Sequence, residues 1–138
     1  MVDNHEYKID GKGRVFIPAD MREELGETFY VTISDENCLN AYSMEGWERF
    51  VSKVDDLPTL QRRMMRPFFS NAIKRELDSQ GRFGLPQKLR DRVGIDKEVT
   101  IVGAGRLVQL WDTETFRHIN DEETKPENLA KIIEELDF

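Results

Sequence analysis

The spacing between hydrophobic positions changes from two to four within a short stretch near the N-terminus. In residues 14–17, the apolar Val15 and Ile17 lie two positions apart, which places them on one face of an extended strand. Met21 and Leu25 lie four positions apart, as on one face of a helix. The pattern predicts a strand that leads into a short helix.

The same pattern occurs a second time. Residues 10–33 align with residues 78–101 without a gap, at a constant offset of 68 positions, and nine of the 24 pairs are identical. Unrelated segments of ordinary composition would share about one or two. An internal repeat of this kind indicates one structural unit used twice. The identical pairs are Asp10/Asp78, Gly13/Gly81, Arg14/Arg82, Pro18/Pro86, Arg22/Arg90, Gly26/Gly94, Val31/Val99, Thr32/Thr100 and Ile33/Ile101.

A turn is expected before the second strand of each copy, in D-G-K-G-R and in D-S-Q-G-R. The carboxylates of Asp10 and Asp78 can accept backbone N–H groups at the start of the turn. Gly13 and Gly81 can adopt a positive φ without steric cost. We therefore predict a tight hairpin turn in each copy, entered by the extended runs Tyr7–Asp10 and Ile73–Leu77.

The ends of the helices follow from proline and glycine. Pro18 and Pro86 suit the first helical position, whose N–H has no helical partner. Gly26 and Gly94 suit the C-terminal cap. Further strands are expected at Phe29–Ile33, Leu39–Tyr42, Glu98–Val102 and Leu107–Trp111, with short helices near Glu45–Val54 and Thr113–Asn120.

Two segments lie outside the repeat. A central helix should begin at Pro58, with an apolar stripe of Leu60, Met64 and Phe68, and Pro67 should end or kink it. The C-terminal segment should form a helix whose apolar face holds Ile132, Ile133 and Leu136. The chain is thus divided into a first unit (5–50), a linking helical segment (51–72), a second unit (76–119) and an acidic tail (121–138).

Composition and charge narrow the class of protein. Of 138 residues, 38% are hydrophobic and 34% are charged. The hydrophobic fraction is large enough to form a folded core. The single cysteine, Cys38, excludes an internal disulfide and a cysteine-based zinc cluster. No run approaches the roughly 20 apolar residues of a membrane span, and the N-terminus lacks the apolar run of a signal peptide. We expect a cytoplasmic protein with no membrane partner.

The net charge of −7 argues against nucleic acid, but the charges are segregated. Residues 60–92 hold nine basic and three acidic side chains, a net charge of +6. Residues 121–138 hold seven acidic side chains and two lysines, a net charge of −5. A local basic surface can therefore exist on an acidic chain.

No pattern of a catalytic or cofactor site is present. His5 and His118, the two histidines, are not spaced with acids as a metal site or a catalytic triad would require. The glycines do not form a phosphate-binding loop. We expect no enzyme activity, no metal, no cofactor and no small-molecule substrate.

The two D-x-x-G-R turns, each followed by an apolar–x–apolar–Pro run, resemble the MraZ family of the AbrB/SpoVT-like swapped-hairpin superfamily. Trp47, the arginine-rich QRRMMR and the closing LWDTETF extend the resemblance over roughly residues 6–116. It implies an α+β fold of the double-split β-α-β type, with two pseudo-symmetric hairpin and helix units. It also implies a ring-like homo-oligomer that binds short direct repeats of double-stranded DNA. These repeats lie upstream of the division and cell-wall gene cluster, where the family represses its own operon.

The resemblance assigns DNA contact to the turn residues. An arginine fork can bond a phosphate, or O6 and N7 of guanine. A salt bridge of each arginine to the aspartate of its own turn is the other interpretation, and the two can hold together. For the second turn, subunit packing in place of DNA contact also remains open. Arg22 and Arg90 are expected in solvated or intersubunit salt-bridge roles. The candidate DNA-binding residues are Lys8, Asp10, Lys12, Gly13, Arg14, Asp78, Gln80, Gly81 and Arg82.

The function expected is that of a sequence-specific, nucleoid-associated transcriptional regulator that acts as a repressor. The alternative is an oligomeric protein-interaction module like the AbrB-type antitoxins. In that case the central Arg62, Arg63 and Arg66 and the acidic tail would be interface elements. An RNA binder is disfavoured, because no exposed aromatic RNA-binding motif is present.

Overall fold

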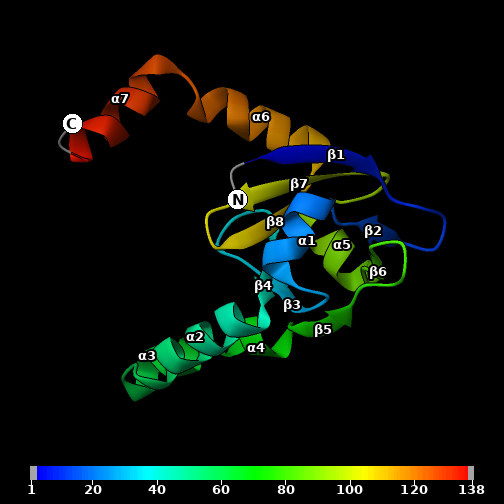
Figure 1. The fold of residues 1–138 in the computed structure, drawn as a ribbon. Coiled ribbons are helices and arrows are strands. Elements are labelled where there is room, and N and C mark those ends of the chain that lie inside the picture. The colour runs from blue at the N-terminus through cyan, green and yellow to red at the C-terminus, as the bar shows by residue number, and fades with distance from the viewer. Residues whose placement is uncertain (1–2, 137–138) are drawn as a thin grey trace.

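A computed structural model of the chain describes residues 3–136. Eight strands and seven helices lie in this part of the chain (Figure 1). The first repeat comprises β1 (Asn4–Lys8), β2 (Arg14–Phe16), α1 (Ala19–Leu25), β3 (Thr28–Ile33), β4 (Leu39–Ser43) and α2 (Met44–Asp55). Then come α3 (Thr59–Met64) and α4 (Arg66–Ser70). The second repeat comprises β5 (Ile73–Glu76), β6 (Arg82–Gly84), α5 (Gln87–Val93), β7 (Glu98–Ala104), β8 (Leu107–Asp112) and α6 (Thr113–Glu123), and α7 (Pro126–Glu135) follows.

The strands form two antiparallel sheets, which confirms the α+β class. The larger sheet has six strands in the order β1-β7-β8-β4-β3-β5. The smaller one pairs β2 with β6. The β3–β4 and β7–β8 hairpins form as the sequence predicts.

The two repeats exchange strands. β1 of the first repeat pairs with β7 of the second, and β5 of the second pairs with β3 of the first. The predicted turns are present, since Asp10 N–H donates to the carbonyl of Arg14 at 3.3 Å and Asp78 N–H to that of Arg82 at 2.8 Å. The strands on either side of each turn are nevertheless not ladder partners, which corrects the simple hairpin expected. Alternation along a strand indicates which face is buried, but it does not indicate the partner strand.

The core lies between the two sheets and the short helices α1 and α5. Val15, Ile17 and Met21 are at most 1% exposed, as their spacing predicts. Pro18 and Pro86 lie one position earlier than predicted, as N-cap residues with extended backbone. The difference is small, because a proline needs no hydrogen-bond acceptor at either position. Other core members are Leu25, Phe29, Val31, Phe83, Leu85, Leu89, Val93, Val99, Ile101, Val108 and Leu110.

Helices α2 and α4 enclose an aromatic cluster with strands β3 and β4. Trp47 stacks on Tyr30 with ring centroids 4.6 Å apart and meets Phe69 edge-on at 5.7 Å. Of the predicted apolar stripe, Phe68 lies on α4 and packs against Phe50 and the core. Leu60 and Met64 on α3 do not pack in this way, since they are 66% and 68% exposed. The helix breaks after Met64 and resumes as α4, which has a proline in its first turn.

The C-terminal helix α7 forms where predicted and extends away from the sheets (Figure 1). Residues 3–136 leave its apolar side chains partly uncovered, since Leu129, Ile132 and Ile133 are between 44% and 51% exposed. The last two residues of the predicted tail lie outside the described residues. Within residues 3–136, no helix has the length and apolar character needed to cross a membrane.

Candidate nucleic-acid interface

The first turn, residues 10–14, is organised by the carboxylate of Asp10. Its Oδ1 accepts the backbone N–H groups of Lys12 and Arg14, both at 2.9 Å. Its Oδ2 lies 2.6 Å from Nε of Arg14. The backbone N–H of Arg14, together with that arginine's side chain, lowers the pKa of Asp10 to about 2. The carboxylate is therefore ionised at neutral pH and holds the arginine at the end of the turn.

The second turn, residues 78–82, repeats this arrangement. Oδ1 of Asp78 accepts the backbone N–H groups of Gln80 and Arg82 at 2.9 Å, and Oδ2 lies 3.2 Å from Nε of Arg82. The backbone N–H of Arg82 also lowers the pKa of Asp78. Gly13 and Gly81 have φ values of +73° and +76°, as the turn chemistry predicts. We call residues 10–14 and 78–82 the paired turns.

The paired turns meet on one surface, because β2 and β6 are neighbours. Val15 and Phe83 point into the core, so Arg14 and Arg82, at alternate positions, lie on the outer face of this two-stranded ribbon. Nη1 of Arg82 reaches to 3.8 Å from the carboxylate of Asp10. The arginines of both repeats therefore belong to one charged cluster.

The salt bridge to aspartate leaves part of each arginine available. Arg14 contacts Asp10 through Nε, and no hydrogen bond within residues 3–136 engages its two Nη groups. Its side chain is 31% exposed, and that of Arg82 is 27% exposed. The salt-bridge and DNA-contact interpretations of these arginines are therefore geometrically compatible.

Arg22 and Arg90, which the sequence predicts in solvated or intersubunit salt-bridge roles, make close contacts within the chain. Each packs against the turn of the other repeat. A Cβ placed on Gly81 would lie 2.6 Å from Nη1 of Arg22, and one placed on Gly13 would lie 2.8 Å from Nη2 of Arg90. Nε of Arg90 also donates to the carbonyl of Leu85 at 2.9 Å. The glycines thus serve for close approach as well as for positive φ.

Another basic residue of this surface was not among the candidates. Arg75 on β5 donates from Nε to the carbonyl of Gly84 on β6, at 2.9 Å. The 68-residue offset makes it equivalent to Tyr7, whose ring meets Phe16 edge-on at 5.1 Å. Arg75 therefore lies beside a glycine where the first repeat has two aromatic rings. The alignment of the two repeats could have identified this difference, because Gly84 stands at the position equivalent to Phe16.

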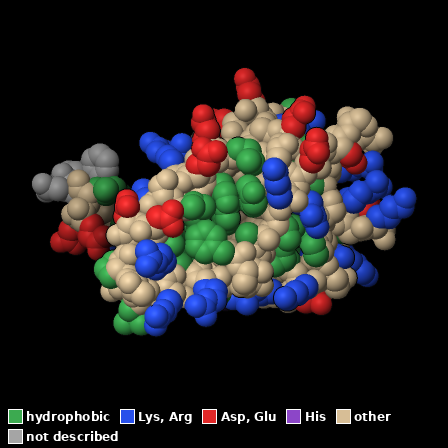
Figure 2. Space-filling view, turned by 90° about the horizontal axis from the view of Figure 1, so that it is seen from below, with side chains coloured by type: hydrophobic (Ala, Val, Ile, Leu, Met, Phe, Trp, Pro, Cys, Tyr) green, Lys and Arg blue, Asp and Glu red, His purple; other side chains and the backbone are tan. Residues whose placement is uncertain are grey.

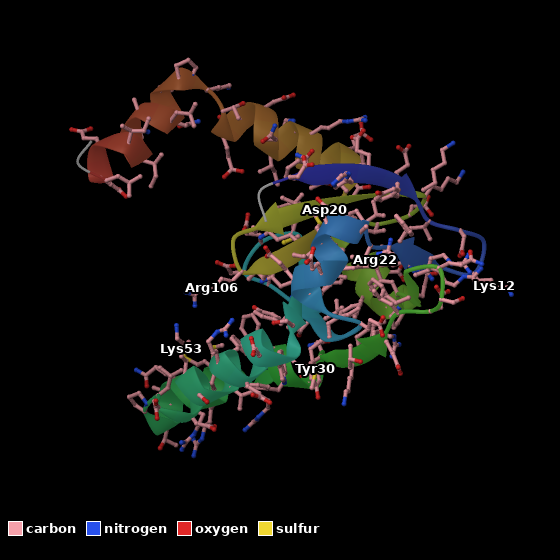
Figure 3. All side chains as sticks on the ribbon, in the orientation of Figure 1. Lys12, Asp20, Arg22, Tyr30, Lys53 and Arg106 are labelled. Atoms are coloured by element: carbon pink, nitrogen blue, oxygen red, sulfur yellow. The ribbon has the colours of Figure 1, made fainter. Side chains whose placement is uncertain are left out.

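The lysines extend the basic surface outward. Lys8 ends β1 and Lys12 lies within the first turn, and both are exposed. Figure 3 shows Lys12 at the outer end of that turn, whereas Arg106 lies on the other side of the molecule. In Figure 2, basic side chains gather at the edge of the molecule that carries the paired turns and also border a hydrophobic patch on the face seen there. Arg62, Arg63 and Arg66 are exposed on α3 and at the start of α4.

These features define a class of small α+β proteins in which two copies of one strand–turn–strand–helix unit share a core. Each copy carries an Asp–Arg turn at the same surface. A family model described as “MraZ protein, putative antitoxin-like” matches residues 1–65 and 68–136. The chain therefore belongs to the MraZ family, as its resemblance predicts. The family is one of regulatory proteins rather than of enzymes.

Proposed function

We propose that this chain is a sequence-specific, DNA-binding transcriptional repressor that acts as a homo-oligomer in the cytoplasm, at the nucleoid. The observation that carries the proposal is the placement of Arg14 and Arg82 on one outer face, where no hydrogen bond from residues 3–136 engages the Nη groups of Arg14. An arginine that is held by a carboxylate through Nε but keeps both Nη groups available can bond phosphate, or O6 and N7 of guanine, with little loss of side-chain entropy.

The crossed strand pairing supports the proposal. We interpret it as the swapped-hairpin, double-split β-α-β arrangement of the AbrB/SpoVT-like units 5–50 and 76–119, joined by the segment 51–72. A two-stranded ribbon such as β2–β6 is narrow enough to approach a groove of the duplex. The proposed DNA-contacting residues are Lys8, Asp10, Lys12, Gly13, Arg14, Asp78, Gln80, Gly81 and Arg82.

The acidic chain requires several subunits for tight binding. A single subunit offers few phosphate contacts against a net charge of −7, so its affinity should be low. A ring-like assembly would engage several short direct repeats at once, and this avidity would raise the overall affinity above that of a single subunit. The proposed targets are the repeats upstream of the division and cell-wall gene cluster that includes the protein's own operon.

Replacing Arg14 by alanine tests the proposal. Fluorescence anisotropy with the upstream DNA should show that R14A loses operator binding while gel filtration shows the oligomer unchanged. Each arginine–guanine contact contributes about 1–3 kcal/mol, and the loss is repeated in every subunit. R106A is the matched control, since Arg106 is exposed on the β7–β8 turn, away from the paired turns. Unchanged binding by R14A would remove Arg14 from the interface.

The second candidate function is an AbrB-like protein-interaction module of the antitoxin type. The exposed apolar side chains of α7 favour it, because such surfaces usually bind other proteins. The family description also includes the term antitoxin-like. A gel-shift experiment with the upstream DNA separates the two functions. If the chain shifts no upstream fragment at low salt, the interaction module becomes the better description.

A further inference from the structure

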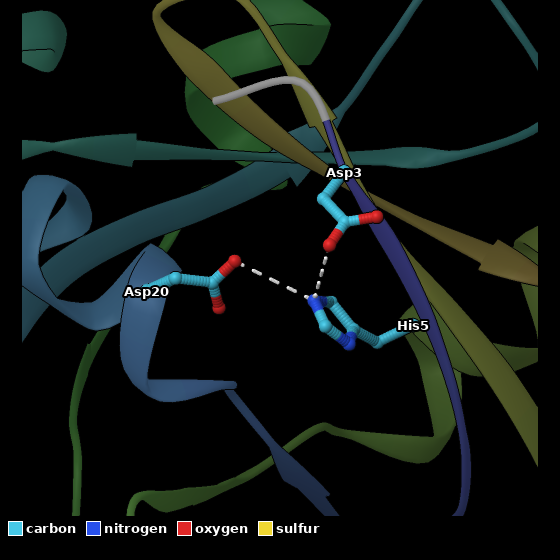
Figure 4. A group of neighbouring side chains, drawn as sticks. All are labelled: Asp3, His5 and Asp20. Atoms are coloured by element: carbon cyan, nitrogen blue, oxygen red, sulfur yellow. Dashed lines mark ion pairs between the residues drawn. The ribbon is translucent and has the colours of Figure 1, made fainter.

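Three side chains that take no part in the paired turns meet at the start of β1. His5 lies on β1, Asp3 immediately precedes this strand, and Asp20 lies in the first turn of α1. Nε2 of His5 is 3.4 Å from Oδ2 of Asp3 and 3.5 Å from Oδ2 of Asp20. Figure 4 shows both carboxylates directed at the same imidazole nitrogen. The spacing of the histidines along the chain does not predict this group, because Asp20 arrives only through the fold.

The backbone holds two of these residues in place. The carbonyl of Asp3 accepts the N–H of Gly103 at 2.7 Å, which continues the β1–β7 pairing. Oδ1 of Asp3 accepts the N–H of Asn4 at 2.8 Å, so Oδ2 is the oxygen left to face the imidazole. The ring of His5 stacks on that of Tyr7 with an interplanar angle of 15°. The group is therefore attached to the sheet and to helix α1 at the same time.

Nε2 of His5 is shielded from solvent yet has no hydrogen-bond partner within the described residues. Both carboxylate oxygens lie beyond the 2.7–3.2 Å of an ordinary N–H···O bond. An imidazole nitrogen carries at most one hydrogen, so it cannot satisfy two carboxylates. Two atoms that each lie 2.0–2.1 Å from a tetrahedral ion are separated by about 3.3 Å. The two distances observed at His5 match this ligand–ligand separation.

We propose that Asp3, His5 and Asp20 bind a divalent first-row transition metal ion such as Zn²⁺. One imidazole nitrogen and two carboxylate oxygens form a donor set of this class, whereas Ca²⁺ and Mg²⁺ prefer oxygen alone. Two carboxylates also balance the charge of the ion. Three protein ligands leave a further coordination position for water. The proposal is independent of DNA binding, because none of the three residues belongs to the paired turns.

The ion joins two elements of the first repeat, β1 and α1. β1 is itself hydrogen-bonded to β7 of the second repeat. A ligand that binds the folded chain alone raises its stability in proportion to the logarithm of ligand concentration over Kd. Zn²⁺ should therefore raise the melting temperature of the full chain, and the rise should require His5.

Isothermal titration of the full chain with Zn²⁺, after treatment with a chelator and dialysis, tests the proposal. The expected result is one saturable site per chain, accompanied by the visible absorption of a four-coordinate ion when Co²⁺ replaces Zn²⁺. H5Q and D20N should each weaken Zn²⁺ binding at least tenfold and abolish the rise in melting temperature. H118Q is the matched control and should bind as the unaltered chain does, since His118 is exposed on α6.

Three results of the Zn²⁺ titrations would overturn the proposal. They are the absence of saturable Zn²⁺ binding, binding that H5Q leaves unchanged, and binding that H118Q abolishes. The first would show that these three side chains do not form a metal site. Far-UV circular dichroism checks that the variants fold, and D3N provides a second ligand variant because Asp3 is exposed and precedes the first strand. Mg²⁺ or Ca²⁺ at equal concentration should not displace Zn²⁺; displacement would contradict the transition-metal assignment.

Discussion

Single residues of the paired turns could be predicted from the sequence because their interactions are local. Asp10 meets its hydrogen-bond partners, Lys12 and Arg14, within four positions, so turn chemistry alone indicates this part of the arrangement. The packing of Arg22 on Gly81 could not be predicted in this way, because it joins residues of different repeats. The turn requires a positive φ, and this alone explains a glycine at position 81. Its second role, to leave room for Arg22, could not be predicted, because only the fold brings Arg22 near.

This close approach leads to a prediction for G81A. Alanine at Gly81 must adopt a positive φ, which costs about 1–2 kcal/mol. Its Cβ would also displace the guanidinium of Arg22, 2.6 Å away, at a further cost of about 1–3 kcal/mol. G94A is the matched control, since Gly94 has φ +73° and open space around the added Cβ. Urea denaturation should show a clearly larger loss of unfolding free energy for G81A.

Equal losses of unfolding free energy in G81A and G94A would mean that Arg22 moves away at no cost. Arg22 would then not hold the second turn in position. The guanidinium lies 5.2 Å from the centre of the Phe16 ring, so its displacement should also disturb the β2–β6 ribbon. Reduced DNA binding by G81A, beyond that of G94A, would connect this contact to the proposed interface.

Whole elements were predictable where hydrophobic spacing repeats, and their partners were not. The strands and helices of both repeats lie close to the predicted ranges. The pairing of β1 with β7 joins segments about 95 residues apart, and alternation carries no information about such a distance. Periodicity likewise identifies the apolar faces of α3 and α7, but it does not indicate what covers them.

The exchange of strands predicts how the two halves of the chain behave when separated. A monomeric half, residues 1–65 or 68–136, should not form its part of the large sheet, because β1 would lack β7 and β5 would lack β3. An unpaired edge of this kind promotes pairing with another chain. In a mixture of the two halves, circular dichroism should show cooperative unfolding, and light scattering should show a one-to-one complex. A half that unfolds cooperatively as a monomer would contradict the prediction.

At the scale of the whole molecule, the charges are arranged so that an acidic chain can present a basic surface. The paired turns lie on one side of the molecule, and the acidic α7 extends on the other (Figure 1). Residues 121–138 alone carry a net charge of −5. If the chain binds DNA as proposed, repulsion from this tail should weaken non-specific contacts, and the affinity should depend on the number of paired turns engaged at once.

Operator binding should accordingly depend on both salt and the spacing of the DNA repeats. An assembly that contacts six to ten phosphates loses about 10³–10⁵-fold in affinity between 50 and 200 mM salt. Binding releases counterions from the DNA, and this release becomes less favourable as the salt concentration rises.

Inserting about 5 base pairs between repeats, half a helical turn, should reduce binding to that of one repeat, since subunits on one assembly would face opposite sides of the duplex. Inserting about 10 base pairs, one helical turn, places the repeats on the same side of the duplex again and is the control. Fluorescence anisotropy on the three spacings measures both effects. Equal affinity for an isolated repeat and the full operator would show that one subunit suffices and that the assembly contributes nothing to recognition.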